Sequence, residues 1–297
     1  MTTHQDHRTV SRPDKVLYPD AGYTKADLAE YHEAVAGVML PHLAGRPLVM
    51  HRFPDGIGDS GFYQKEAPAH VPDFVGTTTV AAGNRRGRVR HIVVGDVDTL
   101  RFLADQACLE LHRWLSRADR IDEPDLIVID IDPPDGVDLA VLRRTVRATS
   151  GLLAEVGLAP HVMATGGSGY HVVAPLERSA GFDEVRALAD GIAGRLVAEE
   201  PDALTTEQRI SARRGRIFLD TNRNAYGQTV VAPYSPRARP GAPVATPIDL
   251  DELGRVAPAG YDLRSVRRRT AQKGDPWADL SAGAVPAAAA RRRLDRL

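Results

Sequence analysis

The chain has 297 residues, 43% of them hydrophobic, which is enough to bury a large core in one domain or in two closely associated lobes. Its formal net charge of −1 gives no overall attraction to nucleic acid, so phosphate contacts would need local clusters of basic residues. The single cysteine, Cys108, excludes an internal disulfide, and no apolar run resembles a signal peptide or a membrane span. We therefore expect a cytoplasmic protein without membrane contacts.

The first half of the chain predicts helices and short strands in alternation. Thr24 followed by Asp27 is typical of a helix cap, and the turn at 83–87 would join two strands into an arginine-rich hairpin. The spacing of apolar residues predicts these elements: a helix over 25–39, a strand over 47–53, two strands within 77–94 and a helix over 98–114.

The second half predicts a longer series of strands and helices. The expected elements are a buried strand at 126–129, a helix over 139–156, strands at 161–164 and 170–176, a helix over 182–197, and strands at 216–220 and 228–234. After Pro240 the chain is proline-rich with few periodic stretches. We expect a flexible N-terminus over 1–11, one domain over 12–280 and a basic tail or short helix over 281–297.

Three groups of arginines follow these elements. They indicate either phosphate contacts or a solvated basic surface, and the sequence favours neither strongly. The groups are Arg85, Arg86, Arg88 and Arg90; Arg209, Arg213, Arg214 and Arg216; and Arg264, Arg267, Arg268 and Arg269.

The strand at 126–129 leads directly into two aspartates, Asp130 and Asp132. Residues i and i+2 of a strand point to the same face roughly 6.6 to 6.8 Å apart, so these carboxylates would lie side by side. A shared divalent cation would offset the cost of burying two anions together. The alternative is structural, with Asp130 capping the strand and Asp132 beginning an Asp-Pro turn.

A third carboxylate and a glycine-rich stretch complete the candidate site. Asp220 also follows a short apolar strand, and three such aspartates could hold two metal ions, although Asp220 would equally suit a turn. Between the carboxylates, the stretch from Thr165 to His171 carries Gly167 and Ser168 and could direct backbone N–H groups and His171 toward a triphosphate. The same glycines also fit an ordinary hairpin turn.

In this order, the elements resemble the polymerase domain of the bacterial ligase-D family, a branch of the archaeo-eukaryotic primases that serves non-homologous end joining. The three motifs that carry the resemblance are Asp130-Ile-Asp132-Pro, Thr165-Gly-Gly-Ser-Gly-Tyr-His171 and Phe218-Leu-Asp220-Thr-Asn-Arg223-Asn. Matching stretches also occur at 14–19, 62–65, 109–112 and 232–243, so the resemblance spans most of 12–280. It implies an α/β (α+β) fold with central β-sheets flanked by helices and a metal-binding cleft.

The resemblance also implies roles for individual residues. Asp130, Asp132 and Asp220 would be catalytic and would ligate Mn²⁺ or Mg²⁺ in a two-metal site. The incoming nucleoside triphosphate would be contacted by His112, Thr165, Gly167, Ser168, His171, Arg223 and Arg237. DNA would be contacted by Lys15 and Lys25, which would grip a 5′-phosphate, and by Phe62, Tyr63 and Lys65, with Phe62 and Tyr63 stacking on the template.

The expected function is therefore a DNA-repair nucleotidyltransferase that adds ribo- or deoxyribonucleotides to a DNA 3′-hydroxyl in gap filling or end joining. Its expected partners are DNA with gaps or double-strand ends, Ku and a separate ATP-dependent DNA ligase at the nucleoid, because no Lys-x-Asp-Gly ligase motif is present. Ser168 departs from the family, which usually has lysine or arginine there. Two alternatives remain: a weakly catalytic module that binds and aligns DNA ends through the 5′-phosphate, and a primase that starts chains without a primer.

Overall fold

The computed structural model describes residues 10–82 and 87–297, so most of the predicted turn at 83–87 lies outside the described residues. The chain divides into two compact units. Unit 1 comprises the described residues of 1–113 together with 231–245 and 261–274. Unit 2 comprises 114–230, 246–260 and 275–297. Each unit thus collects segments that are distant in the sequence.

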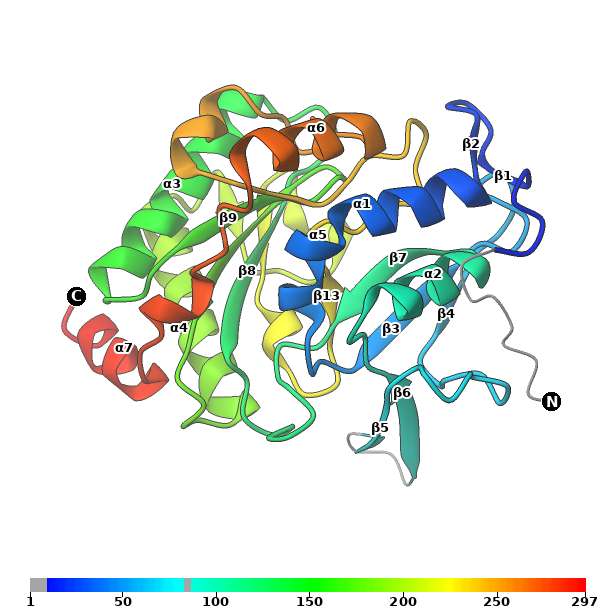
Figure 1. Cartoon of the computed structure of the whole chain (residues 1–297). Helices are drawn as coiled ribbons and strands as arrows, with labels where there is room; N and C mark the ends of the chain where they lie inside the picture. The colour runs from blue at the N-terminus through cyan, green and yellow to red at the C-terminus, as the bar shows by residue number, and fades with distance from the viewer. Residues whose placement is uncertain (1–9, 83–86) are drawn as a thin grey trace. The chain divides into compact units, whose positions relative to one another are not determined.

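Unit 1 is built on a four-stranded sheet with the strand order β13-β7-β3-β4. Two further strand pairs, β1 with β2 and β5 with β6, lie outside this sheet, and helix α1 packs against α2 and α6 (Figure 1). The elements are β1 (Val16–Tyr18), β2 (Tyr23–Thr24), α1 (Lys25–Leu43), β3 (Leu48–Arg52), β4 (Phe62–Gln64), β5 (Thr77–Ala81), β6 (Arg88–Ile92), α2 (Val97–Asp105), β7 (Cys108–Arg113), β13 (Val230–Val231) and α6 (Leu263–Lys273).

Helix α1 forms where the sequence predicts it. The Thr24 hydroxyl accepts from the backbone N–H of Asp27, and the Asp27 carboxylate accepts from that of Thr24, which completes a capping box. Leu28, Val35 and Met39 are fully buried in the core of unit 1, as their helical spacing requires. The helix ends at Leu43, four residues beyond the predicted end.

The predicted helix over 98–114 is correct only in its first half. Helix α2 ends at Asp105, and Ala107 then takes a left-handed conformation (φ 50°) that breaks the helix. The chain continues as strand β7, which lies between β3 and β13 and is buried over nearly all its length. An interior strand carries apolar residues on both faces, so its sequence does not alternate between apolar and polar residues. In this chain the apolar residues of β7 continue the helical spacing of α2, and the sequence pattern therefore predicted one long helix.

Unit 2 contains a six-stranded sheet with the order β11-β12-β8-β10-β9-β14, in which only β11 and β12 are recorded as a parallel pair. Helices α3 and α4 pack against each other and against this sheet. The elements are β8 (Leu126–Asp132), α3 (Leu139–Glu155), β9 (His161–Ala164), β10 (Tyr170–Pro175), α4 (Phe182–Glu199), β11 (Leu204–Thr205), α5 (Ile210–Arg213), β12 (Ile217–Asp220), η1 (Asn222–Asn224), β14 (Thr246–Ile248), η2 (Leu250–Gly254), η3 (Leu280–Gly283) and α7 (Ala287–Leu294).

The predicted strands and helices between 126 and 220 are confirmed, because their apolar runs are long and are separated by clear turns. The predicted strand at 228–234 is reduced to the two residues of β13. Helix α6 was not predicted. Its sequence is rich in arginine, and Leu263 and Val266 are its only buried apolar residues, which is too few to show a helical period. No described helix is long and apolar enough to cross a membrane.

Candidate active site

The three predicted aspartates come together in unit 2 and are called here the acidic triad: Asp130, Asp132 and Asp220. Strand β8 pairs with β12 so that Asp130 lies opposite Asp220, and Asp132 follows two residues later on the same face as Asp130. One carboxylate oxygen from each residue lies within 4.8 Å of the others. Asp130 and Asp220 are both 7% exposed, so the register of this sheet gathers three carboxylates at a largely buried position.

Two predicted nucleotide contacts adjoin the acidic triad. His171 lies opposite Asp130 across the β8–β10 pair, with its Nε2 3.3 Å from Asp130 Oδ1. Arg223 follows β12 and places its Nε 3.3 Å from Asp220 Oδ2 and 3.6 Å from Asp130 Oδ2. The Nδ1 of His171 is buried without a hydrogen-bond partner among the described residues. This ring nitrogen is therefore an unsatisfied buried polar atom beside the acidic triad.

The electrostatics of the acidic triad favour a cation. Burial, together with the neighbouring charge of Asp130, raises the pKa of Asp132 to about 6, against the opposing effect of His171. A buried group of oxygen ligands with one carboxylate pushed toward protonation fits a hard divalent ion such as Mg²⁺ or Mn²⁺. Sequence and structure thus agree on residues that could hold a metal.

The glycine-rich stretch forms a tight turn between β9 and β10. Thr165 Oγ1 donates to the carbonyl of Gly169 (2.8 Å) and accepts from the N–H of Gly167 (3.2 Å). Gly166 has φ +68°, and a Cβ on Gly169 would lie 2.0 Å from the carbonyl oxygen of Ile131, so glycine is required at both positions. Ser168 is exposed at this turn. The turn therefore packs directly against strand β8, which bears Asp130 and Asp132.

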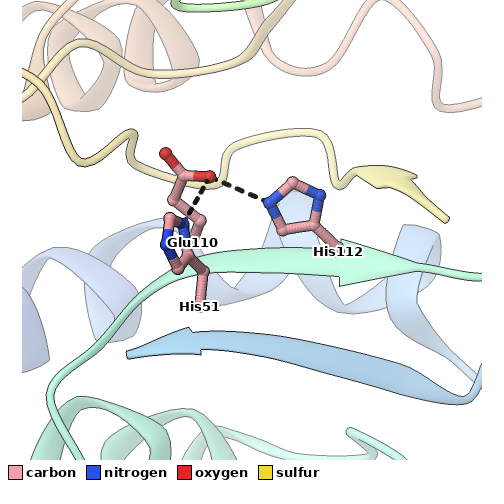
Figure 2. A group of neighbouring side chains, drawn as sticks. All are labelled: His51, Glu110 and His112. Atoms are coloured by element: carbon pink, nitrogen blue, oxygen red, sulfur yellow. Dashed lines mark hydrogen bonds and ion pairs between the residues drawn. The ribbon is translucent and has the colours of Figure 1, made fainter. Parts of the chain in front are cut away.

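His112 and Arg237, the other predicted nucleotide contacts, lie in unit 1 around Glu110. Glu110 Oε2 is 2.9 Å from His112 Nε2 and 3.2 Å from Nδ1 of His51. Glu110 Oε1 accepts from Arg237 Nε at 3.1 Å and from the backbone N–H of Ala238 at 2.9 Å. Figure 2 shows the carboxylate reaching toward both imidazoles. We call Glu110, His51, His112 and Arg237 the Glu110 cluster.

The titration of this cluster follows from its contacts. Burial alone would raise the pKa of Glu110, but hydrogen bonds from His112 and His51 and the charge of Arg237 hold it well below its ordinary value. Burial lowers the pKa of His112, and the hydrogen bond with Glu110 opposes that shift. Glu110 is therefore an ionised acceptor, and His112 is largely neutral near pH 7.

The aromatic residues predicted to stack on DNA lie on edge strand β4. Phe62 is 46% exposed and Tyr63 is 60% exposed. The ring of Tyr63 stacks on that of His51, with centroids 3.9 Å apart and planes 8° from parallel. One side of Tyr63 is thus supported from within unit 1, while most of its surface faces solvent.

The predicted DNA-binding lysines differ sharply in their surroundings. Lys15 is partly exposed and pairs with the exposed Asp55 at 2.7 Å. Lys25 is buried, and its ammonium contacts Asp105 at 2.8 Å together with the carbonyl and hydroxyl oxygens of Ser11. Lys65 is exposed just after β4. Lys25 thus has a folding role in addition to any contact with phosphate.

Glu110 and His51 are candidate functional residues that the sequence did not single out. Glu110 lies within the matching stretch 109–112, two residues before His112, which was the available signal. No comparable signal in the sequence marked His51, because only strand pairing places this residue opposite both Tyr63 and Glu110.

Comparisons with known proteins identify the family of this chain. Residues 24–277 match the model of the family described as LigD, primase-polymerase domain. The multifunctional non-homologous end joining DNA repair protein LigD of Mycobacterium tuberculosis is 34% identical over 93% of this chain and 37% of the relative. For LigD of Pseudomonas aeruginosa the identity is 32%, over 96% of this chain and 34% of the relative.

A solved structure is also similar: the polymerase domain of Mycobacterium tuberculosis ligase D in complex with DNA. It superposes with a TM-score of 0.86 at 33% identity, covering 93% of this chain and 98% of that one. The chain spans little more than a third of the length of the curated relatives named above. The expected primase-type α/β fold is confirmed, and the chain belongs to the LigD primase-polymerase family.

Proposed function

We propose that this chain is a DNA-repair nucleotidyltransferase that extends a DNA 3′-hydroxyl with ribo- or deoxyribonucleotides. The observation that carries the proposal is the acidic triad, three carboxylates gathered by strand register beside His171 and Arg223. Membership of the primase-polymerase family supports the same reaction class.

Asp130, Asp132 and Asp220 would hold Mn²⁺ or Mg²⁺ in a two-metal arrangement. When bound, the metal ions lower the pKa of the attacking 3′-hydroxyl and neutralise charge on the triphosphate. The protein's own contribution is to collect the carboxylates before substrate arrives. Strand pairing fixes Asp130 opposite Asp220, so little reorganisation is required on binding.

The remaining unit 2 residues would bind the nucleotide. Arg223 is close enough to the carboxylates to offer its guanidinium to phosphate once they are neutralised by cations. His171 would contribute a ring nitrogen, and the turn holding Thr165, Gly167 and Ser168 packs against strand β8 beside Asp130 and Asp132. In unit 1, His112 and Arg237 are the other proposed nucleotide contacts.

The DNA contacts would come from unit 1. Phe62 and Tyr63 present exposed rings suited to stacking on any template base, and Lys65 is exposed nearby in sequence. Lys15 and Lys25 would recognise a 5′-phosphate. The solved relative is described as bound to DNA, which supports DNA as the partner. Ku and a separate DNA ligase would act in the same end-joining or gap-filling pathway at the nucleoid.

Primer extension on a short gapped DNA tests the proposal. We expect incorporation that requires Mn²⁺ or Mg²⁺ and increases with a 5′-phosphate at the gap, and the assay would compare ribonucleotides with deoxyribonucleotides. Tight phosphate-dependent binding without incorporation would instead indicate the end-aligning module. In that case Ser168→Lys would test whether the missing basic residue in the turn is the cause.

A further inference from the structure

The Glu110 carboxylate dictates which ring nitrogens of two histidines carry hydrogen. An ionised carboxylate only accepts hydrogen bonds, so Nε2 of His112, which lies 2.9 Å from it, must carry hydrogen. Nδ1 of His51 lies 3.2 Å from the same oxygen but is not aligned for a hydrogen bond, and we expect it to carry hydrogen because an imidazole lone pair would be repelled by the carboxylate at that distance. Neutral His112 then has its other nitrogen, Nδ1, as an acceptor, which becomes a donor if the ring is protonated. The same carboxylate orients Arg237 through its second oxygen.

The Glu110 carboxylate also contacts residues that pack against Tyr63, an exposed aromatic residue of strand β4. Across strands β4, β3 and β7, Tyr63 pairs with His51, and His51 pairs with Glu110. The Tyr63 ring stacks on His51 and meets the His112 ring edge to face, with centroids 5.5 Å apart. Both imidazoles that contact Tyr63 are therefore held by one carboxylate.

We propose that Glu110 is a positioning residue that fixes His112 and Arg237 for the incoming nucleotide and, through His51, couples them to the Tyr63 ring that stacks on the template. This inference rests on the proposed function, since it assigns the mechanism by which unit 1 holds its nucleotide and template contacts together. Movement of Tyr63 on template binding would change the position of His112 through the contacts of the Tyr63 ring with His51 and His112, the His51–Glu110 contact and the Glu110–His112 hydrogen bond.

A metal ion is the competing interpretation, because ligand atoms of His51, Glu110 and His112 lie within 4.8 Å of one another. Two features oppose it. The charge of Glu110 is already balanced by Arg237, whose guanidinium would be repelled by a divalent cation. The Ala238 N–H and Arg237 also occupy the oxygen that a bidentate carboxylate would supply.

The first test needs no variant. In the wild-type chain with ¹⁵N-labelled histidine, NMR should show His112 as the Nε2–H tautomer and His51 as the Nδ1–H tautomer near pH 7.5. The opposite tautomer at either ring would overturn the proposal. So would stoichiometric Zn²⁺ binding that moves both histidine signals and is lost in Glu110→Gln.

The second test is kinetic. Glu110→Gln keeps the size of the side chain but removes its negative charge, so His112 and Arg237 should be held less firmly. KM for the nucleoside triphosphate should then rise about tenfold or more, while kcat should stay within about threefold of the wild-type value. The templated preference for the correct base should fall several-fold, and Glu110→Asp should recover part of both losses. Glu252→Gln is the matched control, because Glu252 is 5% exposed, lies in unit 2 and caps η2.

The outcomes separate this inference from the proposed function. Wild-type protein without any incorporation contradicts the proposed function, while the tautomers would still decide whether Glu110 fixes the two rings. An active wild type whose KM and base preference are unchanged in Glu110→Gln contradicts the positioning role alone. An equal loss in Glu252→Gln would show that the effect is general to buried carboxamides and would also overturn the proposal.

Discussion

Two rows of side chains, one in each unit, make the most informative comparison in this protein. In unit 2 the row runs Asp220, Asp130, His171 across β12, β8 and β10. In unit 1 it runs Tyr63, His51, Glu110 across β4, β3 and β7. Both rows place buried carboxylates beside histidine, yet the pKa of Glu110 is lowered while that of Asp132, two residues after Asp130, is raised.

The opposite pKa shifts of Glu110 and Asp132 follow from the number of hydrogen-bond donors available to each carboxylate. Glu110 is a single carboxylate that accepts hydrogen bonds from His112, Arg237 and the backbone N–H of Ala238 and lies 3.2 Å from Nδ1 of His51; these contacts outweigh burial and lower its pKa. The acidic triad brings three carboxylates together, and the pKa of Asp132 rises to about 6. A buried carboxylate surrounded by donors orients its neighbours, whereas a group of carboxylates without enough donors favours a cation.

The largest effect should come from the acidic triad. Asp130→Asn or Asp220→Asn should reduce nucleotide incorporation by about 10³-fold or more, because several kcal/mol of charge stabilisation by the metals are lost. DNA affinity, measured by fluorescence anisotropy, should change little. Extension at the wild-type rate by a pure variant would show that unit 2 does not hold the catalytic metals.

The next largest effect should follow the removal of Glu110, the carboxylate at the centre of the Glu110 cluster. Glu110→Ala should lower the free energy of unfolding by about 3 kcal/mol, because it leaves Arg237 and two imidazoles without their common acceptor. Urea denaturation would measure this. A change below the error of that experiment would mean that the Glu110 cluster is not a stable part of the fold.

Removing the charge of Asp132 should stabilise the fold, whereas removing Glu110 should destabilise it. Its pKa is about 6 in the folded chain against 3.8 ordinarily, so between roughly pH 4 and 6 the folded state binds more protons than the unfolded state, and stability falls as pH rises. In metal-free protein, Asp132→Asn should therefore raise the free energy of unfolding at pH 8 by about 2 kcal/mol.

That gain should disappear below about pH 4, where Asp132 is protonated in both states. Thermal unfolding at pH 4 and pH 8, in chelator, provides the measurement. Destabilisation by Asp132→Asn at pH 8 would indicate that the acidic triad is satisfied without a cation.

The smallest effect on stability should come from Lys15, whose ion pair with Asp55 is exposed. Lys15→Gln breaks an exposed ion pair and should change stability by less than about 1 kcal/mol, yet it should reduce the preference for 5′-phosphorylated gaps. Lys25→Gln removes a buried ammonium and should destabilise the fold measurably. Competition between phosphorylated and unphosphorylated gaps would test this, and an unchanged preference in Lys15→Gln would contradict its phosphate role.

Several features of the candidate site follow from local sequence. The alternation of a strand puts Asp130 and Asp132 on one face whatever the fold, and Gly166, with φ +68°, permits a tight turn before His171. The cap at Thr24 likewise specifies where α1 begins. These are properties of a few neighbouring residues, so the sequence alone determines them.

The tertiary structure decided the rest, because it depends on pairing between distant segments. Strand register put Asp220 opposite Asp130 and placed His51 between Tyr63 and Glu110, and no local pattern specifies register. Burial on both faces of β7 overrode the helical spacing that continued past Asp105. The sequence therefore determined local features such as strand alternation, the turn and the helix cap, while packing decided which of the candidate residues lie together.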